Sequence, residues 1–271
     1  MTRTAYSIWI VSPAGYPHSR CFEEVALGLQ AAFAELGQEV PAVTDPARIV
    51  GRGIVLGANL LTDFAIHAPA DAILFNLEQI TTEASPWLKP AYFDLLRAHR
   101  VWDYSRRNIE ALAARGVAAA LCEIGYAPAL TRIPPAEVQD IDVVFVGSMN
   151  ARRRRIVQDL RGRGVNVAAL FGVYGAARDA AYARAKIVLN LHYYEARVFE
   201  MVRVSYLLAN RLCVVSETGV DAEIETALAG GVVFSAYDRV VEDCVALLAD
   251  PAARHRIAAH GYERFCAVRQ A

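Results

Sequence analysis

Two stretches in the second half of the chain hold the residue types best suited to binding an anion. The first begins at Gly147, where the missing side chain lets a backbone approach a ligand, and continues with Ser148 and Asn150, which can cap a helix or donate to a phosphate. Arg152 would then lie in the first turn of a helix, where a guanidinium pairs well with a diphosphate. The three arginines directly after it fit a solvated helix face. We therefore predict an anion site that uses Arg152.

The second stretch follows a nearly all-apolar run. His192 and Glu195 fall in the loop after that run, and Arg197, Glu200 and Arg203 recur at three-residue spacing along one side of the next helix. The arginines would meet phosphates, and Glu200 would accept hydrogen bonds from ribose hydroxyls. The alternative is an exposed ladder of ion pairs, which has little energetic value. Because the rest of this helix is apolar, we favour a nucleotide diphosphate site.

Short apolar runs alternate with helical periodicity along the chain, which predicts parallel β-α-β units. We expect strands at 7–12, 39–44, 53–57, 72–76, 100–104, 118–123, 142–147, 165–171, 187–192, 212–216 and 231–234. We expect helices at 22–36, 89–98, 106–115, 152–163, 176–185, 199–208, 240–249 and 251–265. Ligands of open parallel sheets bind at the carboxyl ends of strands. The candidates placed there in the second half are Gly147, Ser148, Asn150, Arg152, Gly172, His192, Tyr193, Glu195, Arg197, Glu200, Arg203 and Glu217.

The alternation is interrupted once. Residues 129–140 contain Pro134 and Pro135 and no apolar periodicity. We therefore expect a linker at 131–140 between an N-terminal domain at 1–130 and a C-terminal domain at 141–271, each a Rossmann-like unit.

Composition narrows the function classes. The hydrophobic share of 55% suffices for packed cores, and the net charge of −1 gives no reason to expect nucleic acid as a partner. The five cysteines form no C-x-x-C pair, which favours reduced thiols in a cytoplasmic protein over a zinc site. No secretory signal and no transmembrane segment is evident.

Several catalytic motifs are missing from the sequence. The only D-x-D, Asp140-Ile-Asp142, precedes a predicted strand and does not follow one, so it fits the linker better than a metal site. The loop at 12–18 lacks the three glycines of a dinucleotide fingerprint. We expect no metal and no cofactor.

The second half resembles a known family through an ordered set of segments. These are Phe145-Val-Gly-Ser148 with its following arginines, the run Ala183–His192, Arg197-Val-Phe-Glu200, Leu212–Glu217 and Arg256–Gly261. In this order they are similar to the C-terminal domain of group-1-type GT-B glycosyltransferases, especially short bacterial members related to spore-coat-maturation proteins. The resemblance covers roughly residues 142–265.

The resemblance implies an α/β GT-B architecture, in which two Rossmann-like domains with parallel sheets face an interdomain cleft. It also implies a nucleotide-sugar donor held by the C-terminal domain and an unidentified acceptor, such as a glycan, lipid-linked sugar, protein or small molecule, on the N-terminal side. Retaining members carry two glutamates around the donor helix, whereas here Glu200 has no clean second partner; Glu195 and Glu217 are the possible substitutes.

An inverting enzyme would need a base for the acceptor hydroxyl. Glu78 follows an apolar run and is the first candidate; His18 and Asp103 are the others. Capping or hydrogen bonding is the alternative role for Glu78. Two other functions stay open, namely a catalytically inactive nucleotide-sugar-binding subunit or regulator, and a nucleotide-sugar epimerase on the same fold.

Overall fold

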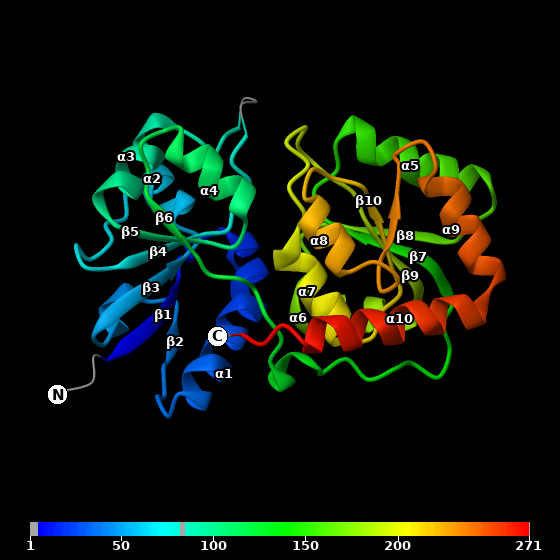
Figure 1. Ribbon diagram of the computed structural model, residues 1–271, viewed down its shortest axis with the longest axis horizontal. Coiled ribbons are helices and arrows are strands. Elements are labelled where there is room, and N and C mark those ends of the chain that lie inside the picture. Colours follow the sequence, from blue (N-terminus) through cyan, green and yellow to red (C-terminus); the bar gives the residue numbers. More distant parts are fainter. Residues whose placement is uncertain (1–4, 82–84, 271) are drawn as a thin grey trace. The chain divides into compact units, whose positions relative to one another are not determined.

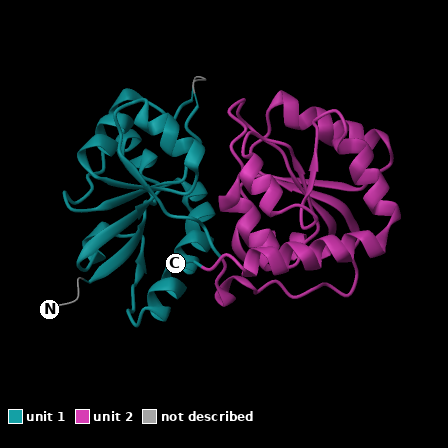
Figure 2. Cartoon of the chain, in the orientation of Figure 1, with its two compact units in different colours: residues 1–125, 270–271 teal, residues 126–269 magenta. Residues whose placement is uncertain are grey.

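The computed structural model describes residues 5–81 and 85–270 of the chain. Contacts divide the chain into two compact units, one of residues 1–125 with 270–271 and one of residues 126–269 (Figure 2). Each unit is a parallel sheet with helices on both faces (Figure 1).

The first unit holds a sheet of six strands in the order β2-β1-β3-β4-β5-β6. Its elements are β1 (Tyr6–Ile10), the 3-10 helix η1 (Pro17–Phe22), α1 (Glu23–Glu35), β2 (Ala42–Val43), η2 (Pro46–Arg48), β3 (Arg52–Leu56), α2 (Asn59–Asp63), β4 (Ile73–Asn76), α3 (Pro90–Ala98), β5 (Arg100–Asp103), α4 (Arg106–Ala113) and β6 (Ala119–Leu121).

Both faces of this sheet are buried. Trp9, Val55 and Leu74 pack in one core with Leu61 of α2 and Leu96 of α3. The residues that alternate with them along the strands are buried as well, and α1 contacts β1 and β2. Burial on both faces explains why the strands read as continuous apolar runs and not as alternating ones.

The second unit holds a sheet of five strands in the order β11-β10-β9-β7-β8. Its elements are η3 (Pro128–Leu130), β7 (Ile141–Val146), α5 (Ala151–Gly162), β8 (Val167–Leu170), α6 (Gly175–Arg184), β9 (Ala185–Asn190), α7 (Met201–Ala209), β10 (Val214–Glu217), α8 (Ala222–Ala227), β11 (Val233–Ser235), α9 (Val240–Ala249) and α10 (Pro251–Cys266).

The strand order creates a switch point between β7 and β9. From β7 the chain moves to β8 on one side and then returns to β9 on the other. The connections that leave the carboxyl ends of β7 and β9 therefore diverge to opposite faces and leave room between them. The loops predicted to bind an anion are the ones that leave these two strands.

Every strand and helix predicted from the sequence has a counterpart in the structure, with ends shifted by a few residues. The short helices α2 and α8 and the 3-10 helices were not predicted, because segments of three to six residues are too short to show helical periodicity.

Residues 131–140, which we expected to be a linker, group with the second unit. The backbone amides of Arg132 and Ile133 both donate to Asn210 Oδ1 at 2.8 Å. The Gln139 side chain donates to the carbonyl of Ala185 at 2.9 Å. At the other end of the chain, Gln270 groups with the first unit.

The close approach of α10 to the residues before β11 depends on glycine. A Cβ added at Gly261 would lie 2.6 Å from the carbonyl oxygen of Gly231 and 2.9 Å from Leu208 Cδ2. We expect Gly261→Ala to lower the free energy of unfolding by about 1–3 kcal/mol, because the backbone of Gly231 cannot yield cheaply. Urea unfolding measures this change.

Gly162, the last residue of α5, is the matched control, since a Cβ there would meet nothing within 4 Å. Gly162→Ala should leave the free energy of unfolding unchanged or raise it by about 0.4–1 kcal/mol. Equal losses in the two variants would contradict the packing argument.

Candidate functional site

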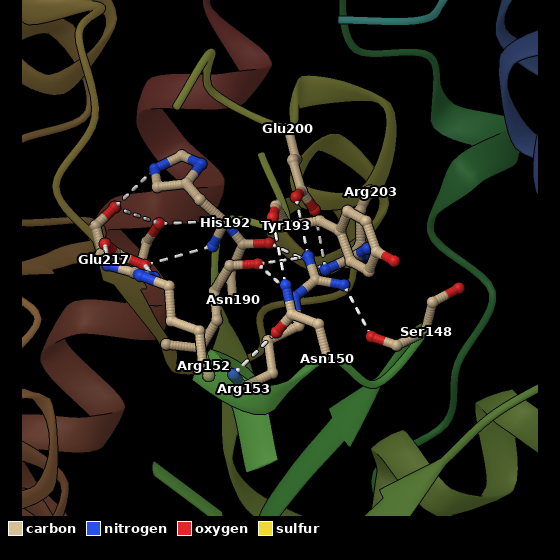
Figure 3. A network of polar contacts seen from close by, with 12 residues as sticks. Ser148, Asn150, Arg152, Arg153, Asn190, His192, Tyr193, Glu200, Arg203 and Glu217 are labelled. Carbon is tan, nitrogen blue, oxygen red and sulfur yellow. Dashed lines mark hydrogen bonds and ion pairs between the residues drawn. The ribbon is translucent and has the colours of Figure 1, made fainter. Parts of the chain in front are cut away.

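The candidate site lies at the carboxyl ends of three adjacent strands of the second unit, β7, β9 and β10 (Figure 3). Asn150 caps α5 by accepting from the backbone amide of Arg153 at 2.9 Å. Its amide nitrogen also donates to the carbonyl of Tyr193 at 3.1 Å, which connects the loop after β7 to the loop after β9. Glu200 occupies the N-cap position of α7. These residues set the start of both helices at the switch point.

Arg153 is the buried centre of this site. Only 2% of its side chain is exposed. Its guanidinium donates to the carbonyl of Ser148 at 2.9 Å, to the carbonyl of Leu191 at 3.0 Å and to Glu200 Oε1 at 3.0 Å. Burial lowers the pKa of Arg153 to about 10. The expectation that the arginines after Arg152 form a solvated face is therefore wrong for this residue, although the two that follow it are exposed.

Glu200 is held between two cations. One oxygen accepts from Arg153 and the other lies 2.8 Å from Arg203 Nη1. Burial favours the protonated carboxyl, but Arg203 and Arg153 outweigh it and hold the pKa of Glu200 below its ordinary value. Arg203 also donates to Asn190 Oδ1 at 3.0 Å. Both carboxylate oxygens of Glu200 thus face arginines, and a contact of Glu200 with a ribose stays a prediction.

Gly147 makes room for this arrangement. Its φ of 153° is one that side chains rarely adopt, and an added Cβ would lie 3.2 Å from Arg203 Nη2. The glycine predicted to let a backbone approach a ligand therefore also lets the guanidinium of Arg203 approach the loop after β7.

Arg152 and Glu217 form a second ion pair beside the first. Glu217 is 1% exposed and binds the Arg152 guanidinium with both oxygens. The Tyr237 ring lies 3.8 Å from the centre of this guanidinium, and its hydroxyl donates to the carbonyl of Arg152 at 2.8 Å. The Arg152 side chain is nevertheless 35% exposed, so one side of it is open to solvent.

His192 is buried against the same carboxylate. Its backbone amide donates to Glu217 Oε2 at 3.2 Å. Burial is the largest effect on the ring and lowers the pKa of His192, so the imidazole is neutral at pH 7. Three guanidinium groups, from Arg152, Arg153 and Arg203, therefore stand against two carboxylates. The site carries one positive charge in excess and can accept an anion.

Three predicted residues make none of the contacts described for this network, whereas the Tyr193 ring belongs to it and lies 5.1 Å from the centre of the Arg153 guanidinium. Arg197, with a φ of 46°, is exposed in the loop after β9, and its guanidinium has no partner among the described residues. Glu195 is exposed in the same loop. Gly172 follows the edge strand β8 and takes no part in the contacts described for the network.

Two of the carboxylates predicted in the first unit fall into one polar cluster. Asp103, at the end of β5, is fully buried. It accepts from Asn76 Nδ2 at 2.6 Å, from the Ser105 amide at 2.8 Å and from Asn108 Nδ2 at 3.2 Å. Burial outweighs these hydrogen bonds and raises the pKa of Asp103 to about 7.

The same two asparagines hold the backbone of Glu78. Its carbonyl oxygen accepts from Asn76 Nδ2 at 3.0 Å and from Asn108 Nδ2 at 2.9 Å. The residue is half-buried, its carboxyl group has no hydrogen-bond partner in the described part of the chain, and burial raises its pKa to about 7. His18, the third candidate, lies elsewhere, after β1 and against the Tyr16 ring at 5.2 Å between centroids.

Sequence reasoning missed Arg153, Asn190 and Tyr237 as members of the site. The sequence did indicate that Arg153 is buried, because this residue lies one turn before Ile156, Val157 and Leu160 on the same face of α5. No sequence pattern indicated that Asn190 and Tyr237 belong to the site, since their roles depend on which strands become neighbours.

The described residues contain neither a metal-binding cluster nor a membrane-spanning helix. Across residues 5–81 and 85–270, no three His, Cys, Asp or Glu side chains are grouped closely enough to hold a metal ion. Over the same residues, no helix combines the length and the apolar character needed to cross a membrane.

No protein-family model matches the chain. Among curated proteins, uncharacterized protein L138 of Acanthamoeba polyphaga mimivirus is 33% identical over 113 residues, which cover 41% of this chain and 13% of that protein. Uncharacterized protein L140 of the same virus is 28% identical over 203 residues, which cover 70% of this chain and 63% of that protein. The chain thus spans less than two thirds of either relative. Both relatives are viral, so the comparison does not support the bacterial source that the resemblance implied.

Solved structures are similar over nearly the whole chain. HepE from Anabaena, in complex with UDP and glucose, has a TM-score of 0.62 at 12% identity, covering 96% of this chain and 94% of that one. Sucrose-phosphate synthase from Thermosynechococcus elongatus has a TM-score of 0.60 at 13% identity, covering 99% and 95%. WaaG, a glycosyltransferase involved in lipopolysaccharide biosynthesis, has a TM-score of 0.54 at 13% identity, covering 95% and 94%. The chain has the GT-B fold of glycosyltransferases, which confirms the predicted fold class.

The buried ion pairs of Arg153 predict a sharp contrast within the arginine run. Arg153→Ala leaves Glu200 buried with one cation fewer and two carbonyl groups without their donor, so we expect a loss of about 3–5 kcal/mol in the free energy of unfolding. Arg154→Ala, next to it and exposed, should change that value by no more than about 0.5 kcal/mol. Chemical denaturation of both variants measures the difference. Similar losses in the free energy of unfolding would contradict the structural role of Arg153.

Proposed function

We propose that the chain is a glycosyltransferase that takes a sugar from a nucleotide-sugar donor bound at the β7–β9 switch point of the second unit. The observation that carries the proposal is the concentration of guanidinium groups at this point, three against two carboxylates, with a further exposed arginine, Arg197, in the loop after β9. The GT-B fold supports it, and UDP bound to HepE makes UDP the first ligand to test.

Arg152 and Arg197 are the proposed diphosphate ligands. Arg197 is exposed with an unpaired guanidinium among the described residues, and Arg152 is partly open to solvent on a Tyr237 platform. A diphosphate adds at least two negative charges to a site with one positive charge in excess. The guanidinium of Arg152 offers five donors in a fixed fork, so it can bind a phosphate oxygen while it keeps a contact to Glu217.

Arg153 and Arg203 have a different proposed role. Their guanidinium groups are bound to Glu200 and to backbone or amide oxygens, so they hold the site in shape and contribute a fixed positive field. In glycosyl transfer the bond between sugar and phosphate breaks and the leaving diphosphate gains negative charge. Preorganised cations and the N-termini of α5 and α7 stabilise that charge, so the proposal requires no metal ion.

Glu78 is the proposed base for the acceptor hydroxyl. Its backbone is fixed by two asparagines, its carboxyl group has no described partner, and its pKa of about 7 suits proton transfer near neutral pH. Asp103 is fully buried and cannot reach an acceptor, so we assign it to positioning: it orients the amides of Asn76 and Asn108 that hold Glu78.

Arg152→Ala tests the donor site. Loss of a charged hydrogen-bonding group should weaken UDP binding roughly tenfold to hundredfold, measured by isothermal titration calorimetry. Arg154→Ala is the matched control, because it removes an exposed arginine two positions along the same helix. EDTA should leave both UDP binding and release of UDP from UDP-sugars unchanged. Undiminished binding by Arg152→Ala would reject the site.

Glu78→Gln tests the base. We expect the transfer rate to fall by about two to four orders of magnitude while UDP binding stays unchanged. In the unaltered enzyme kcat/KM should rise with pH and level off above about 7, because the base acts only when deprotonated. Product analysis with and without acceptor, followed as UDP release, distinguishes transfer from epimerisation and from binding alone. A Glu78→Gln enzyme with full activity would exclude this residue.

A further inference from the structure

Four partly exposed aromatic rings of the first unit form a cluster that the proposed chemistry does not use. Tyr16 is its centre: the ring centroids of His18, Phe64 and Trp87 lie 5.2, 5.8 and 6.2 Å from that of Tyr16. Phe64 is 43% exposed, and the other three rings are half-buried at the edge of the core. The cluster thus presents one exposed ring beside three half-buried ones, and apolar groups gathered at a surface are typical of binding sites.

The cluster is assembled by three separate strand exits. Tyr16 and His18 follow β1, Phe64 ends α2 in the connection after β3, and Trp87 lies in the connection after β4. In the order β2-β1-β3-β4, the chain passes from β1 to β2 on one side and to β3 on the other, so β1 and β3 flank the switch point of this sheet. Ligands of open parallel sheets bind at such a point.

Polar groups accompany the rings. Lys89 Nζ and Asp63 Oδ1 form an ion pair of 2.6 Å next to Phe64 in sequence, with Lys89 half exposed. Two oxygens in the same strand exits are buried and have no hydrogen-bond partner among the described residues, Ser19 Oγ beside His18 and Gln79 Oε1 in the connection after β4. A buried polar atom of this kind needs a partner that the described residues do not supply, such as a bound water or a ligand hydroxyl.

This combination selects one class of ligand. A pyranose ring has a face of C–H groups, which packs on the electron-rich face of an aromatic ring, and a rim of hydroxyls, which bond to carboxylate, ammonium and amide groups. Three of the four rings are Tyr, His and Trp, which carry their own polar atoms, whereas a site for an acyl chain would be lined by aliphatic side chains. Two cations of these strand exits are already paired, Lys89 with Asp63 and Arg20 with Glu23, which disfavours a phosphate.

We infer that the cluster of Tyr16, His18, Phe64 and Trp87 is a carbohydrate subsite that binds a pyranose ring. Its assignment to the acceptor, which would then be a glycan or a glycoside, rests on the proposed function; the binding itself does not. The subsite lies in the unit that also carries Glu78.

The indole N–H signals of the full chain test the subsite directly. The chain has three tryptophans, and Trp87→Phe identifies the Trp87 signal. The probes are the methyl glycosides of glucose, galactose, mannose and N-acetylglucosamine at millimolar concentrations, with open-chain sorbitol as the matched control. At least one glycoside should move the Trp87 signal saturably and sorbitol should not. The Trp9 signal should stay still, because that indole is buried and donates to the carbonyl of Thr44.

Three substitutions, two in the cluster and one control, locate the effect. Phe64→Ala removes an exposed ring at little cost to stability and should lower the affinity for the glycoside roughly threefold to tenfold. Tyr16→Ala should lower this affinity by a similar factor. Leu36→Ala removes a side chain that is 62% exposed at the end of α1 and should change nothing. Equal affinity in Phe64→Ala and Leu36→Ala would overturn the inference.

Three outcomes reject the subsite: no glycoside moves the Trp87 signal, sorbitol moves it equally, or phosphatidylglycerol vesicles broaden it while no sugar does. UDP titration of the same samples separates the two proposals. UDP binding without glycoside binding would reject the subsite alone, whereas glycoside binding without UDP binding would reject the proposed donor site and leave the subsite standing.

Discussion

The buried guanidinium of Arg153 is the group on which the arrangement of the candidate site depends. A buried cation is tolerated only where carboxylates and carbonyl oxygens surround it. Here these oxygens come from Ser148 after β7, from Leu191 after β9 and from Glu200 at the start of α7. Satisfying one charge therefore fixes the exits of two strands and the position of a helix. Glu200, once held by Arg153, holds Arg203 in turn.

The neighbouring pair of Arg152 and Glu217 has a different character. Glu217 is as buried as Arg153, but Arg152 reaches it from a solvent-exposed side and rests on the Tyr237 ring. The first ion pair is thus part of the framework, and the second presents a cation that an incoming anion can share. This division explains how one short run of arginines supplies both a structural residue and the proposed diphosphate ligand, since neighbouring positions on a helix point in different directions.

The two units use the same topology for opposite chemistry. In each sheet the first strand lies between the next two strands of the chain, β1 between β2 and β3 and β7 between β8 and β9. Polar and aromatic side chains gather in the connections that follow these strands. The second unit gathers guanidinium groups there. The first gathers carboxyl groups whose pKa values are raised to about 7 and a set of aromatic rings. Cations suit a leaving diphosphate, whereas carboxyl groups poised near neutrality and aromatic faces suit a hydroxyl-bearing sugar.

Local sequence determined the strands and helices, because apolar periodicity depends only on neighbours along the chain, and it placed Arg152, His192, Glu200 and Glu217 at the ends of strands. It also placed Asn76 and Asp103 at the ends of two strands that the structure makes adjacent. Tertiary structure decided which of these residues meet. The burial of Arg153, the engagement of Glu200 by two arginines and the exposure of Arg197 all follow from the order β10-β9-β7, which brings together loops more than 40 residues apart in the chain. Such pairings are set by packing between distant segments, and no pattern within a single segment encodes them.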